Sequence, residues 1–255
     1  MRLKDKVIII TGATSGIGKA LTIRAVAEGA KVLIHGISKE DGQKLLDHLG
    51  KSVALCIADL EDLSSPKKIV DCALDAFGQI DAVVNNAASI ERSNLQQITP
   101  EAFTKTITIN LQSALFLVQA AFAHLKKTGG NVLNIGSINA YTGESSLLAY
   151  SISKAGLQTM TRNLANAHGV DGVRFNLINP GWILTDREYA DQIKKGLPEN
   201  WPTKLGPENI PFGKMSTPEQ LASACIYWLS DESKPFTGSV VDLEQFSIIG
   251  RNPEK

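Results

Sequence analysis

Short aliphatic runs alternate with longer segments of helical period along most of the chain, and this alternation constrains the fold more than any other feature. The first run, Val7–Ile10, is continuously apolar, as in strands that are buried on both faces of a parallel sheet. Residues 16–28 have helical spacing, and Gly29 marks the end of that helix. The same pattern predicts further strands at 31–35, 53–58, 80–85, 131–135, 173–178 and 239–243, and helices ending at Leu49 or spanning 69–77, 100–127, 150–168 and 219–229. Seven strands alternating with six helices indicate one doubly wound α/β domain over residues 1–255, with a seven-stranded parallel sheet and helices on both faces.

Residues 182–217 interrupt this alternation. Five prolines lie in this segment or directly after it: Pro198, Pro202, Pro207, Pro211 and Pro218. This composition favours an irregular or mobile insertion rather than a second core. The insertion is a candidate substrate lid in which Tyr189 and Trp201 supply aromatic side chains. Packing of the segment onto its own domain is the alternative.

Charge balance and cysteine content narrow the class of protein. The chain carries 26 Lys and Arg against 26 Asp and Glu, so it lacks the positive surplus with which proteins bind nucleic acids or anionic membranes. No apolar run approaches the roughly 20 residues that span a bilayer, and the first residues lack the apolar core of a signal peptide. Cys56, Cys72 and Cys225 are scattered and form no C-x-x-C pair. We therefore expect a cytoplasmic protein with free thiols, without metal, nucleic acid or membrane as a partner.

A glycine-rich stretch, residues 11–18 (TGATSGIG), lies where the first strand passes to the first helix. Gly12 permits a tight turn, while Gly16 and Gly18 let the backbone approach a pyrophosphate and let the helix pack closely. The N–H groups at the helix start would face the phosphates. The spacing is G-x-x-x-G-x-G and, taken alone, also fits an ordinary strand–helix turn. Because no G-K-S/T follows, phosphoryl transfer is not favoured.

Tyr150 and Lys154 lie four residues apart and therefore on one face of the predicted helix. A solvated helix start would carry such a pair equally well. Ser137, however, ends the fifth predicted strand just before this helix. All three side chains are therefore expected at the carboxyl edge of the sheet, where the glycine loop also lies. Three polar groups that converge beside a nucleotide site are rarely there by accident.

With these motifs in this order, the sequence resembles the short-chain dehydrogenase/reductase family, which has a Rossmann-type fold. The matching stretches are residues 11–18, Asp59-Leu60, residues 85–88 (NNAA), Asn110, Ser137, Tyr150 with Lys154, and Pro180-Gly181 with Thr185. The resemblance implies an NAD(P)-dependent oxidoreductase that interconverts a secondary alcohol and a ketone. It implies that Tyr150 is the acid/base and that Ser137 orients the substrate oxygen. It further implies that Lys154 holds the nicotinamide ribose and that Asn110 supports a water-linked proton relay. For Asn110, purely structural hydrogen bonds are the alternative.

The resemblance also implies a set of cofactor contacts along the carboxyl edge. They are Gly12, Thr14, Ser15, Gly16, Ile17, Gly18, Gly36, Ser38, Asp59, Leu60, Asn86, Ala87, Tyr150, Lys154, Pro180, Gly181, Ile183 and Thr185. For Asp59, capping of a helix is the alternative. The sequence departs from the family pattern at two places. Ala88 stands where the family usually has Gly, and residues 241–246 (VDLEQF) replace the usual Gly-Gly near the C-terminus.

The acid/base role requires a change in the pKa of Tyr150. A phenol has an ordinary pKa of about 10, which is too high for a base near neutrality. A nearby ammonium and a positive nicotinamide ring stabilise the phenolate, and a decrease of about 3 pKa units corresponds to roughly 4 kcal/mol. In the reductive direction Tyr150 would protonate the developing alkoxide, to which Ser137 also donates.

The end of the second strand lacks a carboxylate that would select NAD, because Gly36 stands at that position. Ser15 and Ile37 occupy positions where NADP-preferring members of the family usually have arginine. Gly36 leaves space for a 2′-phosphate, and Ser38 and Lys39 could donate to it. The sequence therefore predicts NADP rather than NAD as the cofactor.

The segment between Ser137 and Tyr150 carries two polar candidates for substrate binding, Asn139 and Glu144. These two side chains could bind hydroxyls of a sugar or polyol, although exposed loop residues are the more common explanation. A 3-oxoacyl-thioester reductase is one alternative. A non-catalytic dinucleotide-sensing regulator is another, although such a protein would be expected to lack Tyr150 or Lys154. The expected partners are a small-molecule substrate and, by the resemblance, further copies of the chain in a homotetramer or dimer assembled through the two long helices.

Overall fold

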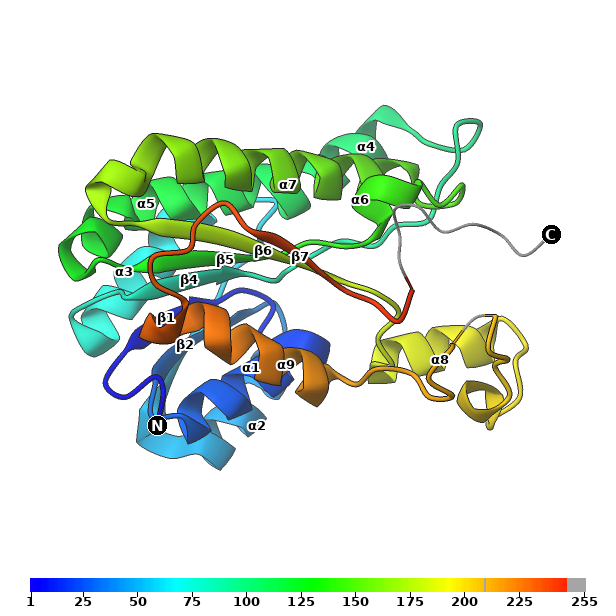
Figure 1. Ribbon diagram of the computed structural model, residues 1–255, viewed down its shortest axis with the longest axis horizontal. Coiled ribbons are helices and arrows are strands. Elements are labelled where there is room, and N and C mark those ends of the chain that lie inside the picture. Colours follow the sequence, from blue (N-terminus) through cyan, green and yellow to red (C-terminus); the bar gives the residue numbers. More distant parts are fainter. Residues whose placement is uncertain (209, 247–255) are drawn as a thin grey trace.

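The computed structural model describes residues 1–208 and 210–246, in which seven parallel strands form one sheet (Figure 1). The sheet order is β3-β2-β1-β4-β5-β6-β7. The strands are β1 (Val7–Ile10), β2 (Lys31–Gly36), β3 (Val53–Ile57), β4 (Ala82–Asn85), β5 (Asn131–Ile135), β6 (Arg174–Pro180) and β7 (Val240–Leu243). The direction of winding reverses between β1 and β4, and in open parallel sheets ligands bind at such a point, outside the carboxyl ends of the strands.

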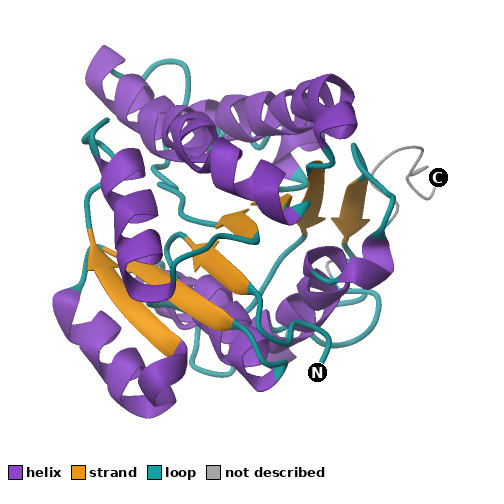
Figure 2. Ribbon diagram, turned by 90° about the vertical axis from the view of Figure 1, so that its left-hand side faces the viewer, coloured by secondary structure: helices purple, strands orange, loops and turns teal. Residues whose placement is uncertain are grey.

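Helices cover both faces of the sheet, as Figure 2 shows in the view turned by 90°. One layer contains α1 (Gly16–Ala27), α2 (Lys39–Leu49) and α9 (Pro218–Leu229), and the other contains α3 (Ser65–Phe77), α5 (Ser113–Thr128) and α7 (Leu148–His168). The alternation of side chains along β1 builds both cores. Ile8 and Ile10 pack in the cluster on the α1/α9 side, while Ile9 packs in the cluster on the α3/α5 side.

The predicted fold class is confirmed: the described residues form one seven-stranded parallel sheet between two helical layers. β1 and β5 begin and end at the predicted residues, and each of the other strands differs from the prediction by one or two residues at one or both ends. Two helices were not predicted, α6 (Asn139–Thr142) and α8 (Asp186–Lys194). The segment at residues 182–217 is thus more regular than its proline content suggests. Its helix begins at an N-cap, because the Thr185 side chain accepts a hydrogen bond from Glu188 N.

The longest apolar helical segment is Pro100–Thr128, made of α4 (Pro100–Ile107), a π-helical turn (Thr108–Gln112) and α5. By length and mean hydropathy (1.4) it could cross a membrane, contrary to the expectation that no apolar run is long enough. Scattered Thr, Asn and Gln side chains interrupt the run without lowering its mean hydropathy much. In the structure α5 packs on the sheet through Leu117, Ala121 and Leu125, so this is a core helix of an α/β layer. Only 39% of its most apolar window is buried, which leaves an apolar outer face.

Candidate active site

The carboxyl edge of the sheet brings together loops from several strands. The glycine loop follows β1, Asn86 follows β4, Ser137 follows β5, and Pro180 ends β6. Tyr150 lies in the first turn of α7, and its hydroxyl lies near the Ser137 side chain, which acts to lower the pKa of the phenol. Both side chains are buried. The structure therefore places the predicted phenol and hydroxyl close together, at the carboxyl edge of the sheet.

The glycine loop is held by side chains that come from β1 and β4. Asn86 Nδ2 donates to the carbonyl oxygens of Thr11 (2.8 Å) and Gly12 (3.1 Å). Thr11 Oγ1 accepts hydrogen bonds from the backbone N–H groups of Asn86 and Ala87, both at 3.0 Å. Gly12 has a φ of +61°, which favours glycine. Asn86 and Ala87, which are predicted cofactor contacts, thus also hold the glycine loop in place through hydrogen bonds.

The start of α1 fits the pyrophosphate of a dinucleotide. Ser15 is the N-cap residue, but its side chain makes no capping hydrogen bond, and the first turn contains no acidic residue. The N–H groups of this turn therefore keep their capacity to bind an anion. A Cβ at Gly18 would overlap Gly12 O and lie 2.6 Å from Asn86 Nδ2, so only glycine allows α1 to pack against the loop.

His35 is a member of the site that the sequence analysis missed. It lies at the end of β2, is buried, and accepts a hydrogen bond from Gly12 N at Nδ1 (3.4 Å). Nε2 lies 3.0 Å from the carbonyl oxygen of Ala58, to which it donates. Burial lowers the pKa of His35 below its ordinary value, so the ring is neutral at neutral pH. A histidine at a strand end carries no sequence signal for this role, which depends on how the loop folds over it.

In the protein without a cofactor, the pKa of Tyr150 is raised above its ordinary value, and its expected decrease by the ammonium together with the nicotinamide ring stays a prediction. Burial is the main cause, and the nearby Ser137 side chain counteracts it only in part. Lys154 Nζ lies 5.6 Å from the centre of the Tyr150 ring and donates to the carbonyl oxygen of Ile135 at 2.7 Å. The phenol is therefore neutral at neutral pH and carries its proton.

Lys154 is held in the core at a cost in stability. It is 2% exposed, and burial lowers its pKa from 10.5 to about 8. Because the unfolded state binds the proton more tightly, the free energy of unfolding rises with pH between about 8 and 10.5. A lysine kept at such a position indicates a functional rather than a structural role.

We expect Lys154→Met to remove this pH dependence. At neutral pH the variant should gain up to about 3 kcal/mol of stability, since one pKa unit corresponds to about 1.4 kcal/mol, less the cost of an unpaired Ile135 carbonyl. Urea denaturation at pH values on both sides of the window measures this, with the exposed Lys51→Met as the control. An unchanged pH slope in Lys154→Met would contradict the assignment of the titration to this lysine.

Asn110 lies in the π-helical turn, and its side chain is fully used in structural hydrogen bonds. Its Oδ1 accepts from Ser89 N (2.7 Å), and its Nδ2 donates to Ser89 O (3.0 Å) and to Ser153 Oγ (3.0 Å). Asn110 therefore ties the loop after β4 to α7, one turn from Tyr150. This geometry favours the structural alternative for its side chain, and a proton relay remains a prediction.

A side chain at position 36 would collide with Thr14, and the predicted space for a 2′-phosphate at Gly36 stays a prediction. A Cβ at Gly36 would lie 2.6 Å from Thr14 Cγ2 and 2.8 Å from Thr14 Oγ1. Gly36 is therefore required by the glycine loop itself. β2 ends without a carboxylate, as the sequence shows. Ser38 is the N-cap residue of α2, and its Oγ accepts a hydrogen bond from Asp41 N at 3.2 Å.

The remaining predicted cofactor contacts lie along the same edge. Asp59 is exposed, and its Oδ1 accepts from Glu61 N (2.9 Å) within a turn. It does not cap a helix, because α3 begins at Ser65 with Ser64 as its N-cap residue, and a contact with the cofactor stays a prediction. Leu60 and Ile183 are buried. Thr185 lies against the glycine loop, since its Cγ2 would be 3.5 Å from a Cβ at Gly16.

The two predicted substrate residues already have partners within the protein. Asn139 N donates to Ser137 Oγ at 3.1 Å and so helps to orient that hydroxyl. Glu144 is exposed and forms an ion pair with Arg92 (2.6 Å). Burial raises the pKa of Glu144, but hydrogen bonds from Arg92 and Ser146 outweigh it and hold the carboxyl ionised. The pair joins the loop after β4 to the loop before α7, a role for Arg92 that its sequence context does not reveal.

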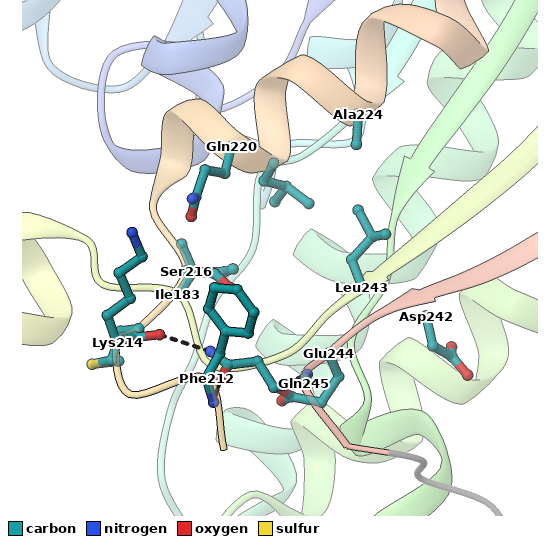
Figure 3. A pocket seen from close by; sticks show the side chains of 12 residues that line it. Ile183, Phe212, Lys214, Ser216, Gln220, Ala224, Asp242, Leu243, Glu244 and Gln245 are labelled. Carbon is teal, nitrogen blue, oxygen red and sulfur yellow. Dashed lines mark hydrogen bonds between the residues drawn. The ribbon is translucent and has the colours of Figure 1, made fainter. Parts of the chain in front are cut away.

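The residues that replace the usual Gly-Gly hold the insertion in place. A Cβ at Gly181 would overlap the carboxylate of Glu244, which accepts from Trp182 N at 3.2 Å. Gln245 donates to the carbonyl oxygen of Lys214 (2.9 Å) and accepts from Phe212 N (2.9 Å). These residues line a cavity of about 400 Å³ between the insertion, α9 and the end of β7 (Figure 3). Tyr150 and Ser137 do not line it.

The aromatic side chains of the insertion pack on one another. The ring centres of Trp182 and Trp201 are 5.7 Å apart, and those of Tyr189 and Trp201 are 6.4 Å apart. Trp201 is buried with Ile210 and Met215 in a small separate cluster. Figure 1 shows that α8 and the rest of the insertion lie beyond the carboxyl edge of the sheet. Tyr189 and Trp201 thus build the insertion, and a role as a lid remains a prediction.

Comparisons with known proteins agree with this geometry. A family model described as enoyl-(acyl carrier protein) reductase matches residues 12–244. The chain is 32% identical to an L-rhamnose 1-dehydrogenase (NAD(P)(+)) of Azotobacter vinelandii, over 94% of this chain and 95% of that protein. It is 32% identical to a 3-oxoacyl-(acyl-carrier-protein) reductase of Thermotoga maritima (98% and 100% covered) and 33% identical to a D-xylose 1-dehydrogenase of Caulobacter vibrioides (92% and 93% covered). The chain therefore belongs to the short-chain dehydrogenase/reductase family of NAD(P)-dependent oxidoreductases.

Proposed function

We propose that the protein interconverts a secondary alcohol and a ketone or lactone group of a sugar or polyol, with Tyr150 as the acid/base. The observation that carries this proposal is the buried group at the carboxyl edge in which Tyr150 lies near Ser137, with Lys154 Nζ 5.6 Å from the centre of the Tyr150 ring. The bound nicotinamide supplies or takes up the hydride. The protein's own residues bind the substrate oxygen and move one proton to or from it.

In the reductive direction, the neutral phenol of Tyr150 donates its proton to the oxygen of the substrate carbonyl as negative charge develops there. Ser137 Oγ donates a second hydrogen bond to the same oxygen, and Asn139 N holds that hydroxyl in position. The positive charge of Lys154 favours the phenolate that remains. In the oxidative direction the same groups act in reverse, and the phenolate takes the proton of the substrate hydroxyl.

Two kinds of support favour a sugar or polyol. Two of the similar proteins named above are dehydrogenases of rhamnose and xylose. Polar groups, among them the Asn139 side chain, also flank Ser137. A 3-oxoacyl thioester is the second candidate, because the reductase of Thermotoga maritima matches over its whole length.

A substrate screen with both cofactors tests the proposal, with the absorbance of the reduced nicotinamide as the readout. Turnover of aldoses or polyols is the expected result. Turnover of β-ketoacyl thioesters alone would contradict a sugar or polyol as the substrate and would favour a 3-oxoacyl thioester. Stoichiometric cofactor binding without turnover of sugars, polyols, steroids or thioesters would contradict the proposed enzymatic activity. It would favour a dinucleotide-sensing regulator instead.

We further propose NADP as the preferred cofactor, because β2 ends without a carboxylate that would bind the ribose hydroxyls of NAD. Gly36→Asp should weaken both cofactors, since the new side chain collides with Thr14. The double variant Gly36→Asp with Thr14→Ala relieves this collision and should bind NADH at least about tenfold more tightly than NADPH, because a carboxylate repels the 2′-phosphate.

Fluorescence titration of NADH and NADPH measures this shift, with Thr14→Ala alone as the control that should keep the preference of the wild type. A strong preference of the wild-type protein for NADH would contradict the proposal. Equal effects of the double variant and Thr14→Ala would show that position 36 does not contact the adenosine end.

We propose that the chain forms a homotetramer or dimer through its two long helices. The supporting observation is apolar exposure on these helices: Phe103 and Leu115 are 38% and 39% exposed, and Ile152 of α7 is 45% exposed. Light scattering measures the assembly, and a monomer at micromolar concentration would contradict it. The cytoplasm is the expected compartment, because Cys56, Cys72 and Cys225 are free thiols.

A further inference from the structure

A network of hydrogen-bonded side chains lies beside Ser137, at the junction of β6, α7 and β7, with the buried Asn179 at its centre and the exposed Asp242 at its outer end. Asn179 belongs to β6 and is 0% exposed. Its Oδ1 accepts a hydrogen bond from Ser137 N at 2.9 Å. Its Nδ2 donates to Gln158 Oε1 of α7 at 3.2 Å and to Asp242 Oδ1 of β7 at 2.8 Å. The amide group is therefore bonded on both sides.

The acceptors fix which way the amide faces. Asp242 presents a carboxylate oxygen, which accepts hydrogen bonds. Of the two ends of the Asn179 amide, only the NH₂ group can donate to it. The carbonyl oxygen of that amide is thereby directed at Ser137. Hydrogen bonds to an ionised acceptor are stronger than neutral ones, so Asp242 holds this orientation more firmly than Gln158 alone would.

The backbone of Ser137 depends on this contact. Its two neighbours donate to backbone carbonyls of β6: Gly136 N to Ile178 (2.7 Å) and Ile138 N to Pro180 (3.2 Å). Ser137 N donates instead to the side chain of Asn179. Gly136 makes room for this bond, because a Cβ there would overlap Asn179 Oδ1. A buried N–H without an acceptor is costly, so loss of Asn179 would displace the backbone of Ser137.

We propose that Asn179, oriented by Asp242 and Gln158, is a positioning residue that sets the place of the Ser137 hydroxyl against Tyr150. This inference rests on the proposed role of Ser137 as a donor to the substrate oxygen. Two anchors then hold Ser137: Asn179 on its backbone and Asn139 N on its Oγ. A donor must meet the developing charge within a few tenths of an ångström to stabilise it, so the placement of Ser137 controls kcat rather than cofactor binding.

The first test compares Asn179→Ala with Asn131→Ala, a change of the same size at the other end of the sheet. Asn131 begins β5, is buried and donates to Leu229 O at 3.3 Å. We expect Asn179→Ala to lower kcat by about 10- to 100-fold with KM for the cofactor nearly unchanged, because a small misplacement of a catalytic group costs about 100-fold. Asn131→Ala should lose stability but keep kcat. Equal kcat in Asn179→Ala and the wild type, or equal losses in both variants, would overturn the proposal.

A charge exchange supplies a second test. Asn179→Asp keeps an acceptor for Ser137 N but sets its carboxylate against that of Asp242, so kcat should fall. The double variant Asn179→Asp with Asp242→Asn exchanges the two groups. The amide introduced at position 242 then donates to the carboxylate introduced at position 179, whose other oxygen can accept from Ser137 N. We expect this double variant to recover kcat to within about threefold of the wild type, given that the coupled pair is restored. A double variant no better than the single one would overturn the role of Asp242.

Hydrogen exchange separates this inference from the proposed reaction. Mass spectrometry of a peptide spanning residues 135–139 reports the protection of the Ser137 amide without any turnover. Faster exchange in Asn179→Ala than in Asn131→Ala is expected, even if the substrate screen finds no activity. Unchanged protection would overturn the inference by itself. An inactive wild type with the expected loss of protection would overturn only the proposed reaction.

Discussion

Replacing Tyr150 by phenylalanine should lower kcat by about 10³-fold or more, because the variant loses the group that gives and takes the proton. The aromatic ring stays, so the packing in the first turn of α7 is conserved. Tyr150 is 8% exposed and lies near Ser137 inside the site. We therefore expect the dissociation constant of the cofactor to remain nearly unchanged. Steady-state kinetics and cofactor fluorescence measure the two quantities separately.

Tyr227→Phe is the matched control for this variant. Tyr227 lies on α9, where its ring contacts Trp228 edge-on at 5.2 Å, and it takes no part in the site. Its loss of a phenol hydroxyl should leave kcat unaltered. Near wild-type turnover in Tyr150→Phe would remove the basis of the proposed reaction.

Gly18→Ala should have the second large effect, on cofactor binding and on stability together. The added methyl group would overlap Gly12 O and approach Asn86 Nδ2 to 2.6 Å, and the first of these atoms is backbone. Relief requires α1 to move away from the loop that presents its N–H groups. We expect a loss of about 1–3 kcal/mol in the free energy of unfolding, typical of an overfilled site, and at least a tenfold weaker cofactor, roughly 1.4 kcal/mol.

Gly169→Ala serves as its control. Gly169 follows α7 with a φ of −58°, and nothing lies within 4 Å of the position its Cβ would take. Alanine there should be neutral or slightly stabilising. Thermal unfolding and cofactor titration of both variants decide the point. A Gly18→Ala protein that binds cofactor as tightly as the wild type would show that α1 need not approach the loop.

The sequence pattern predicted the framework because each strand is a buried run. Val7–Ile10 and its neighbours are apolar since both faces of the sheet are covered, and this leaves a signal that can be read along the chain. The proximity of Ser137 and Tyr150 was predictable for a related reason. In a parallel sheet, residues that follow a strand and begin the next helix share one edge.

Features that depend on packing through space were out of reach. Thr14 lies against Gly36, and His35 supports Gly12, although nothing near them in the sequence indicates either contact. The pKa of Tyr150 is raised because burial outweighs the effect of Ser137, a balance that sequence spacing cannot supply. Asn110 was assigned by resemblance, and only the structure shows that Ser89 and Ser153 occupy its side chain.

The insertion between β6 and α9 has a practical consequence for altering this enzyme. Trp182, Trp201 and Met215 associate mainly with one another, and hydrogen bonds from Gln245 fasten the segment to the rest of the chain. Because the insertion has its own small hydrophobic cluster, it can be exchanged as one segment. Replacing the segment between Pro180 and Thr217 by that of another family member should therefore leave the sheet and the positions of Ser137 and Tyr150 unchanged.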